Sequence, residues 1–131
     1  MENSNFAFKQ QPSKSIHLLA WRLAFGICVV VVLVLALMPK DMAIPSTGWD
    51  KSNHLLAFSV MALLGLHAYP GRAMAVLAGL LTYGVLIEVL QSFTPNRSAD
   101  WQDVVADSIG LILGWASQLL GQFMCRLRAN P

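Results

Sequence analysis

Four long apolar runs follow one another along the chain, with short polar segments between them. A run of about 20 mostly apolar residues is long enough to cross the hydrocarbon core of a bilayer as an α-helix. Proline follows each of the first three runs within two residues, and proline does not continue a helix. We therefore predict membrane-spanning helices at residues 18–38, 53–69, 73–93 and 104–124, preceded by a polar tail at residues 1–15.

The proportions of residue types support lipid, rather than water, as the surrounding solvent. Hydrophobic residues make up 56% of the chain and charged residues 12%, whereas soluble domains average about 25% charged residues. The net charge is only +2, without a basic stripe, which argues against nucleic acid as a partner. We predict one all-α domain over residues 1–131, an integral membrane four-helix bundle whose main partner is the lipid bilayer.

Basic residues are unevenly distributed between the two sides of this bundle. Six of the nine Lys and Arg residues belong to the N-terminal segment, the turn at residues 70–72 and the C-terminus, and three belong to the other two loops. Because Lys and Arg are enriched in cytoplasmic loops, both termini are predicted to be cytoplasmic. The loops at residues 39–52 and 94–102 then face outward, with Trp49 and Trp101 at the outer interface.

Polar side chains in or beside the predicted spans collect toward the outward side. A charged side chain at the bilayer centre costs at least about 2.5–3.5 kcal/mol, so such residues commonly mark a site or a path. The polar positions are Asp50, His54, Glu88, Gln91, Asp103 and Asp107. Lys51 and Arg97 lie in or beside the outward loops. We predict that these eight residues form an outward-facing polar pocket.

The fourth run carries a regular stripe of acidic and small residues on one helix face. Its members advance by four and three residues in turn: Asp103, Asp107, Gly110, Gly114, Ser117 and Gly121. Small residues at this spacing let membrane helices approach closely, and Gly110 with Gly114 forms a GxxxG pair. We predict that the four small residues pack against a neighbouring helix. The same stripe would also allow two copies of the chain to associate as a homo-oligomer.

The polar positions also fall into three ordered motifs. These are Asp50-Lys51-x-x-His54-x-x-x-Phe58, then Gly84-x-x-x-Glu88-x-x-Gln91-x-Phe93-x-Pro95-x-Arg97, then Asp100-x-x-Asp103-x-x-x-Asp107-x-x-Gly110. Over about residues 49–114, the chain resembles the VanZ-like family, which consists of small bacterial integral-membrane proteins with four or more spans. One departure is Asp107, because the family pattern usually has Asn at this position.

The resemblance implies a multi-pass protein of the bacterial inner (plasma) membrane with a role in the cell envelope. Founding members of the family are associated with resistance to teicoplanin-type glycopeptides, so antibiotic resistance is an expected context. The resemblance implies no established reaction. It therefore assigns neither an enzymatic activity nor a cofactor or metal to this chain.

One hypothesis is a non-enzymatic envelope protein. Its outward pocket would bind or shield a lipid-linked or anionic head group, such as that of a cell-wall precursor. Arg97 would be the main anion contact, because its planar guanidinium suits phosphate and carboxylate. Lys51 would assist, and Gln91 would supply a hydrogen bond.

A second hypothesis is an intramembrane enzyme that acts on a lipid-linked phosphate. Asp50, His54, Glu88 and Asp103 have the right chemistry to hold a divalent metal or to share acid–base roles. Familiar catalytic signatures such as a P-loop, Gly-x-Ser-x-Gly or His-Glu-x-x-His are missing from the sequence.

Two further interpretations stay open. In one, Glu88 and Asp107 are protonation sites of an ion-coupled transporter subunit. In the other, the polar residues serve packing alone, with Glu88 paired to His54 or to Arg97.

Overall fold

The computed structural model describes residues 12–38, 50–94 and 99–129 of the 131-residue chain. It contains four α-helices: α1 (Pro12–Leu37), α2 (Asp50–Ala68), α3 (Ala73–Gln91) and α4 (Trp101–Ala129). The described residues form no β-strand. The prediction of an all-α four-helix fold is therefore confirmed.

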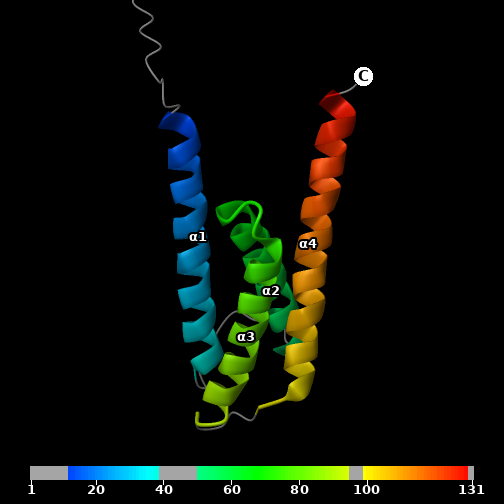
Figure 1. The fold of residues 1–131 in the computed structure, drawn as a ribbon. Coiled ribbons are helices and arrows are strands. Elements are labelled where there is room, and N and C mark those ends of the chain that lie inside the picture. The colour runs from blue at the N-terminus through cyan, green and yellow to red at the C-terminus, as the bar shows by residue number, and fades with distance from the viewer. Residues whose placement is uncertain (1–11, 39–49, 95–98, 130–131) are drawn as a thin grey trace, which may run out of the picture.

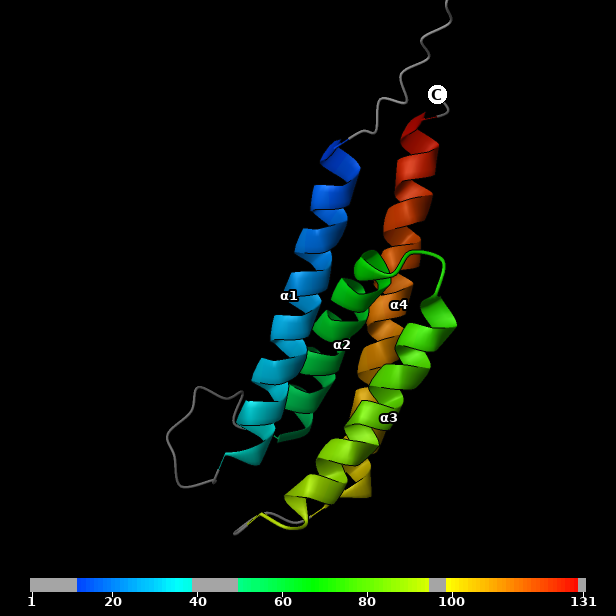
Figure 2. The same cartoon turned by 60° about the vertical axis from the view of Figure 1, so that its left-hand side comes forward.

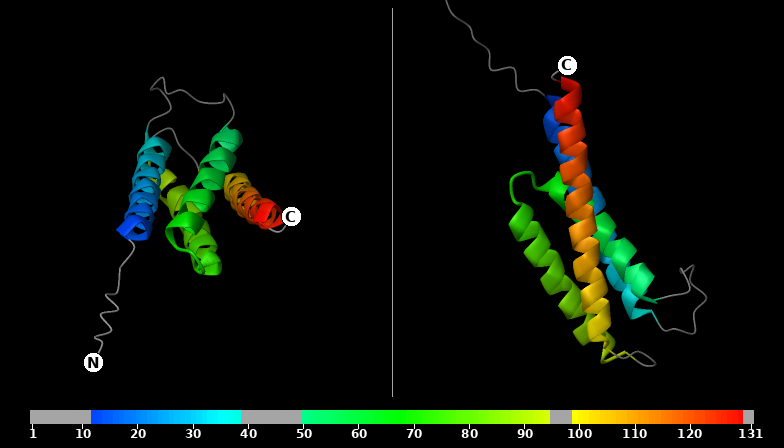
Figure 3. Two further views of the ribbon diagram at one scale, coloured as in Figure 1. Left: turned by 90° about the horizontal axis from the view of Figure 1, so that it is seen from above. Right: turned by 90° about the vertical axis from the view of Figure 1, so that its right-hand side faces the viewer.

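The helices alternate in direction. Helices α2 and α4 point one way, and α1 and α3 point the other way (Figures 1 and 2). The start of α1 and the end of α4 consequently lie at the same end of the molecule, and α2 and α3 stand between α1 and α4 when the bundle is viewed from above (Figure 3). Helix α2 contacts each of the other three helices, and its contact with α4 is the most extensive. Helix α2 is thus the centre of the fold.

Three of the helices, α1, α3 and α4, are long and apolar enough to cross a membrane. Helix α2 is not among them because its first turn is polar, with Lys51, Ser52 and Asn53 following Asp50. Its middle is nevertheless enclosed by the other helices. The protein is a membrane protein, and the crossing of the bilayer by α2 remains a prediction.

Large apolar side chains cover the outer surfaces of α1 and α4. Ile27 and Val30 on α1, and Ile112 and Leu120 on α4, are each at least 60% exposed. Contiguous apolar surface of this kind is unusual on a water-soluble monomer. The apolar surface instead fits lipid chains as the surrounding solvent.

The helix ends follow local sequence signals. Helix α1 begins at Pro12, inside the predicted tail at residues 1–15, because proline is well suited to the first position of a helix. A tight turn joins α2 to α3: Gly71 takes a φ of +79°, and Arg72 N–H donates to the Tyr69 carbonyl at 3.1 Å. Glycine adopts this left-handed conformation without a Cβ clash, so α3 can return directly beside α2.

Two glycines of α4 set the distance between α4 and α2. A Cβ on Gly110 would lie 2.5 Å from the Leu55 carbonyl oxygen, and one on Gly114 would lie 2.6 Å from the Ser59 carbonyl oxygen. The two backbones are therefore in direct contact. Small residues allow such contact between membrane helices, where lipid removes most of the hydrophobic drive for association.

The contact ends before the predicted stripe does. Ser117 is exposed, and a Cβ on Gly121 would meet nothing within 4 Å. The C-terminal part of α4 extends beyond the end of α2 (Figures 1 and 2). The expectation that Ser117 and Gly121 pack against a neighbouring helix is therefore not met in the described chain.

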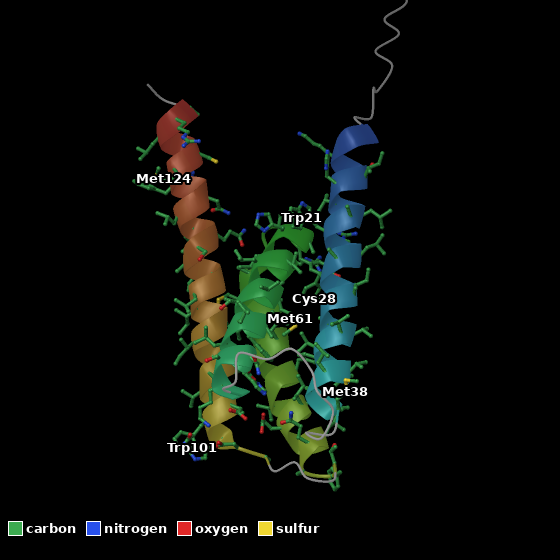
Figure 4. All side chains as sticks on the ribbon, turned by 180° about the vertical axis from the view of Figure 1, so that it is seen from behind. Trp21, Cys28, Met38, Met61, Trp101 and Met124 are labelled. Atoms are coloured by element: carbon green, nitrogen blue, oxygen red, sulfur yellow. The ribbon has the colours of Figure 1, made fainter. Side chains whose placement is uncertain are left out.

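The apolar core lies in the middle of the bundle and draws on every helix. Its buried members are Phe58, Met61, Ala62, Leu80, Ile87 and Leu111, and side chains of α1 pack against them. Figure 4 shows Trp21 and Trp101 on opposite sides of this core along the bundle. Trp21 lies near the end of α2, and Trp101 lies at the start of α4. Tryptophans commonly mark the two membrane–water interfaces.

Helix α1 is fastened to its neighbours at both ends. Arg22 Nε donates to the Ala68 carbonyl at 3.3 Å, at the end of α2. At the other end, Gln91 Nε2 donates to the Ala36 carbonyl at 2.9 Å. Between them, the Tyr83 hydroxyl of α3 donates to the Val29 carbonyl at 2.7 Å. These polar contacts orient α1, and apolar packing adds to them.

The glycine contacts generate a testable prediction. The Gly114→Leu substitution should destabilise the fold by about 1–3 kcal/mol, because a side chain must force the α2 and α4 backbones apart. Gly121→Leu is the matched control, since open space surrounds Gly121. Thermal unfolding of the two variants in detergent, followed by circular dichroism, measures the effect. Equal unfolding temperatures would contradict the close α2–α4 contact.

Candidate functional site

Five buried polar side chains meet at the end of the bundle where α2 and α4 begin and α3 ends. They are His54 on α2, Glu88 and Gln91 on α3, and Asp103 and Asp107 on α4, each less than 10% exposed. The alternating helix directions bring these segments to one level. Oxygen and nitrogen atoms of side chains gather between the helices near Trp101 in Figure 4.

A buried histidine–carboxylate pair forms the inner part of the cluster. His54 Nδ1 lies 2.9 Å from Asp107 Oδ1, and Asp107 is completely buried. The carboxylate favours a proton on Nδ1, so that in a neutral ring Nε2 carries the lone pair for a further partner. The ring of His54 also stacks parallel to that of Phe58, with centroids 6.5 Å apart. His54 is therefore held in one orientation.

Glu88 joins α3 to the segment that leads into α4. Its Oε2 accepts a hydrogen bond from the Asp100 backbone N–H at 2.8 Å. Its other oxygen, Oε1, is buried and accepts no hydrogen bond within the part of the chain that the structure describes. Among the described residues, His54 is paired with Asp107, and the alternative structural pair of Glu88 with His54 is not formed.

Lys51 lies at the rim of the cluster, half-buried. Its Nζ is 3.0 Å from Asp100 Oδ2 and 3.8 Å from Asp103 Oδ1. A hydrogen bond from the Gln102 backbone N–H, together with the Lys51 ammonium, holds the pKa of the Asp100 carboxyl below its usual range. Asp100 is therefore ionised at neutral pH, and it neutralises Lys51.

The remaining predicted site residues are placed as follows. Gln91 bonds to α1 rather than to the His54–Asp107 pair. Asp50 is the first residue of α2, but its side chain lies outside the described atoms. Arg97 lies outside the described residues. The predicted Glu88–Arg97 pair consequently stays a prediction.

The described cluster carries more negative than positive groups. Glu88, Asp103 and Asp107 are buried, while Lys51 is shared with Asp100. Buried charge in a membrane segment is stable only when it is paired, hydrated or bound to an ion. One ligand atom from each of His54, Glu88 and Asp103 lies within 4.8 Å of the other two, so these three residues could hold a metal ion.

An open groove of about 350 Å³ runs between α2 and α4 beside the cluster. Its lining consists of Lys51, Ser52, Leu55, Trp101, Gln102, Val105, Ala106 and Ile109. Leu55, Val105, Ala106 and Ile109, farther along the two helices, are apolar, and Lys51 and Gln102 lie at the end where the helices begin.

The groove was not predicted from the sequence. Trp101, Val105 and Ile109 recur every four residues and so share a face of α4. This spacing was a usable signal, but an apolar face in a membrane helix normally contacts lipid. Asp100 was also missed as a site residue, although it belongs to one of the spaced motifs.

Comparison with known proteins identifies the family of the chain. A family model described as VanZ/LLP1 matches residues 3–122, which is more of the chain than the spaced motifs cover. The resemblance inferred from those motifs is therefore confirmed. Neither a curated protein nor a solved structure matches the chain.

The His54–Asp107 pair generates a second prediction. Asp107→Leu should destabilise the protein by about 1–3 kcal/mol, because it removes the buried partner of His54. Asp107→Asn should lose much less, since its amide oxygen can still accept the Nδ1–H bond. Unfolding in detergent with increasing denaturant compares the two variants. The pair would have no structural importance if both variants were as stable as wild type.

Proposed function

Because the chain belongs to the VanZ/LLP1 family, we propose that it is a cell-envelope protein whose polar site binds an anionic lipid head group. In this proposal the site faces outward from the bacterial inner membrane, with both termini in the cytoplasm. Binding or shielding the head group of a lipid-linked cell-wall precursor would contribute to tolerance of glycopeptide-type antibiotics.

The groove between α2 and α4 is the observation that carries the proposal. A lipid needs an apolar surface for its chain and a polar contact for its head group. Leu55, Val105 and Ile109 supply the first, and Lys51 at the end of the groove supplies the second. The groove is open rather than enclosed, so a lipid chain can enter it sideways from the bilayer.

Lys51 is the natural contact for a phosphate among the described residues of the groove. Lysine binds phosphate as a point charge, and the present partner of Lys51 is the partly exposed carboxylate of Asp100. An incoming head group would replace Asp100 in this ion pair. Arg97, outside the described residues, is the second proposed anion contact.

The His54–Asp107 pair supports a second candidate function. A carboxylate that fixes one nitrogen of a buried imidazole is an arrangement that orients a general base. The second candidate is therefore an intramembrane enzyme that hydrolyses a lipid-linked phosphate, with His54 as the base.

Lipid binding tests the first candidate. Native mass spectrometry of the detergent-solubilised protein would measure binding of a short polyprenyl phosphate and, as a neutral comparison, phosphatidylcholine. Lys51→Gln should weaken binding of the phosphate lipid about tenfold, because a hydrogen bond to a charged group contributes about 1.5–3 kcal/mol. Arg128→Gln, a neutralised cation at the far end of α4, should bind as wild type does.

The apolar part of the groove has its own matched pair of variants. Ile109→Trp would fill the groove, whereas Ile112→Trp adds the same bulk on α4 outside the groove lining. Only the first should reduce lipid binding. Wild-type affinity in both Lys51→Gln and Ile109→Trp would overturn the proposed lipid site.

Phosphate release and drug tolerance separate the two candidates. Expressed in a glycopeptide-sensitive bacterium, the wild-type protein should raise the inhibitory concentration of teicoplanin, and Lys51→Gln should raise it less. His54→Gln should preserve tolerance if the protein only binds lipid. Release of inorganic phosphate from polyprenyl phosphate by wild type, lost in His54→Gln, would favour the enzyme instead.

A further inference from the structure

We infer that His54, Glu88 and Asp103 form a binding site for a divalent transition-metal ion, with zinc as the best-matched ion. The three ligands come from α2, α3 and α4, so the ion would tie three helices together. This inference goes beyond the proposed lipid site and does not depend on it.

The geometry of the three side chains is close to that of a metal site. Their nearest ligand atoms all lie within 4.8 Å of one another, and each residue is less than 10% exposed. Ligand atoms around a tetrahedral zinc ion with bonds of about 2.1 Å are about 3.4 Å apart. Side-chain rotations that shorten the separations by up to about 1.4 Å would bring the three ligand atoms to this spacing.

His54 is already oriented as a metal ligand. Metal-binding histidines commonly donate their second ring N–H to a carboxylate, which fixes the tautomer and the ring orientation. Asp107 occupies that position, 2.9 Å from Nδ1 of His54. Nε2 is therefore the nitrogen that would bind the ion, and Asp107 would act as a positioning residue.

The carboxylate of Glu88 provides an independent observation that points to a ligand. The side chain is 95% buried, since only 5% of its surface is exposed. The Asp100 backbone N–H holds Oε2, whereas Oε1 accepts no hydrogen bond from the described residues. A buried oxygen without a partner is costly. A cation beside Oε1 removes that cost.

Charge and donor type both select the class of ion. The described cluster has an excess of carboxylates, which a divalent cation would offset. Imidazole with carboxylates suits zinc and similar transition metals, while magnesium and calcium prefer oxygen ligands alone. Cys28 lies on α1, and Cys125 lies near the far end of α4, so the expected ligands are nitrogen and oxygen without sulfur.

The position of the ion would bear on the proposed lipid site. Three protein ligands leave a fourth position open on zinc. One of the three, Asp103, lies 3.8 Å from Lys51 at the groove. The ion would lower the repulsion between the acidic cluster and a phosphate group that approaches Lys51.

Metal content of the full-length protein in detergent tests the inference. After chelator treatment, the protein is dialysed against micromolar zinc, and bound metal is counted by elemental mass spectrometry. Wild type should retain one zinc ion per chain. Glu88→Gln and His54→Gln should each bind zinc at least tenfold more weakly. His67→Gln is the matched control, because it removes an exposed histidine in the last turn of α2, away from the three ligands, and it should bind as wild type does.

Zinc X-ray absorption of the wild-type protein gives a measurement that does not depend on any variant folding. Nitrogen and oxygen ligands at about 2.0–2.2 Å, with imidazole scattering, are expected. Sulfur ligands at about 2.3 Å, no retained zinc, or unchanged affinity in both Glu88→Gln and His54→Gln would each overturn the inference.

The experiments can refute the metal site and the lipid site independently of each other. Zinc is counted without added lipid, and polyprenyl phosphate binding is measured with and without chelator. One zinc ion per chain without lipid binding would support the metal site and refute the lipid site. Lipid binding by a protein that retains no zinc would refute the metal site and leave the lipid site standing.

Discussion

The direct backbone contact between α2 and α4 at Gly110 and Gly114 is the constraint on which the rest of the structure depends. Lipid chains are as apolar as the helix surfaces, so close packing rather than hydrophobic burial must hold the two helices together. Because the helices run in the same direction, this contact brings their first turns to one level. His54 and Asp107 meet there, and Lys51 reaches Asp100 and Asp103.

Burying a polar cluster costs free energy in a membrane protein, and the residue types in the cluster restrict the class of ligand that it can bind. Asp107 is completely buried, and Glu88 keeps one oxygen without a hydrogen-bond donor among the described residues. A purely structural cluster would be expected to satisfy its own buried atoms. The excess of carboxylates favours a cation inside the cluster, while the apolar groove with Lys51 at its end favours an anionic lipid beside it. The two proposed ligands would thus occupy neighbouring positions with complementary charge.

Position 107 is where the chain departs from the family resemblance inferred from its spaced motifs. The family pattern usually has Asn where this chain has Asp, and both side chains offer an oxygen that can accept the Nδ1–H of His54. The hydrogen bond that orients His54 is therefore compatible with either residue. Unlike an amide, the Asp107 carboxyl group can also carry a negative charge, which a nearby cation would offset.

Hydrophobic run length, proline positions and the placement of acids predicted four helices, a lipid environment and the end of the bundle where polar groups collect. These properties are local, since each depends on the composition of one segment. The partner of His54 could not be predicted: the sequence left a pair with Glu88 as one alternative, whereas Asp107 is the observed partner. The end of the α2–α4 contact before Ser117 was not predictable either, and the spacing of the apolar groove residues on α4 did not distinguish a groove from a lipid-facing surface. Only the tertiary structure decided them, because they depend on the rotation and divergence of whole helices, which contacts between different segments determine.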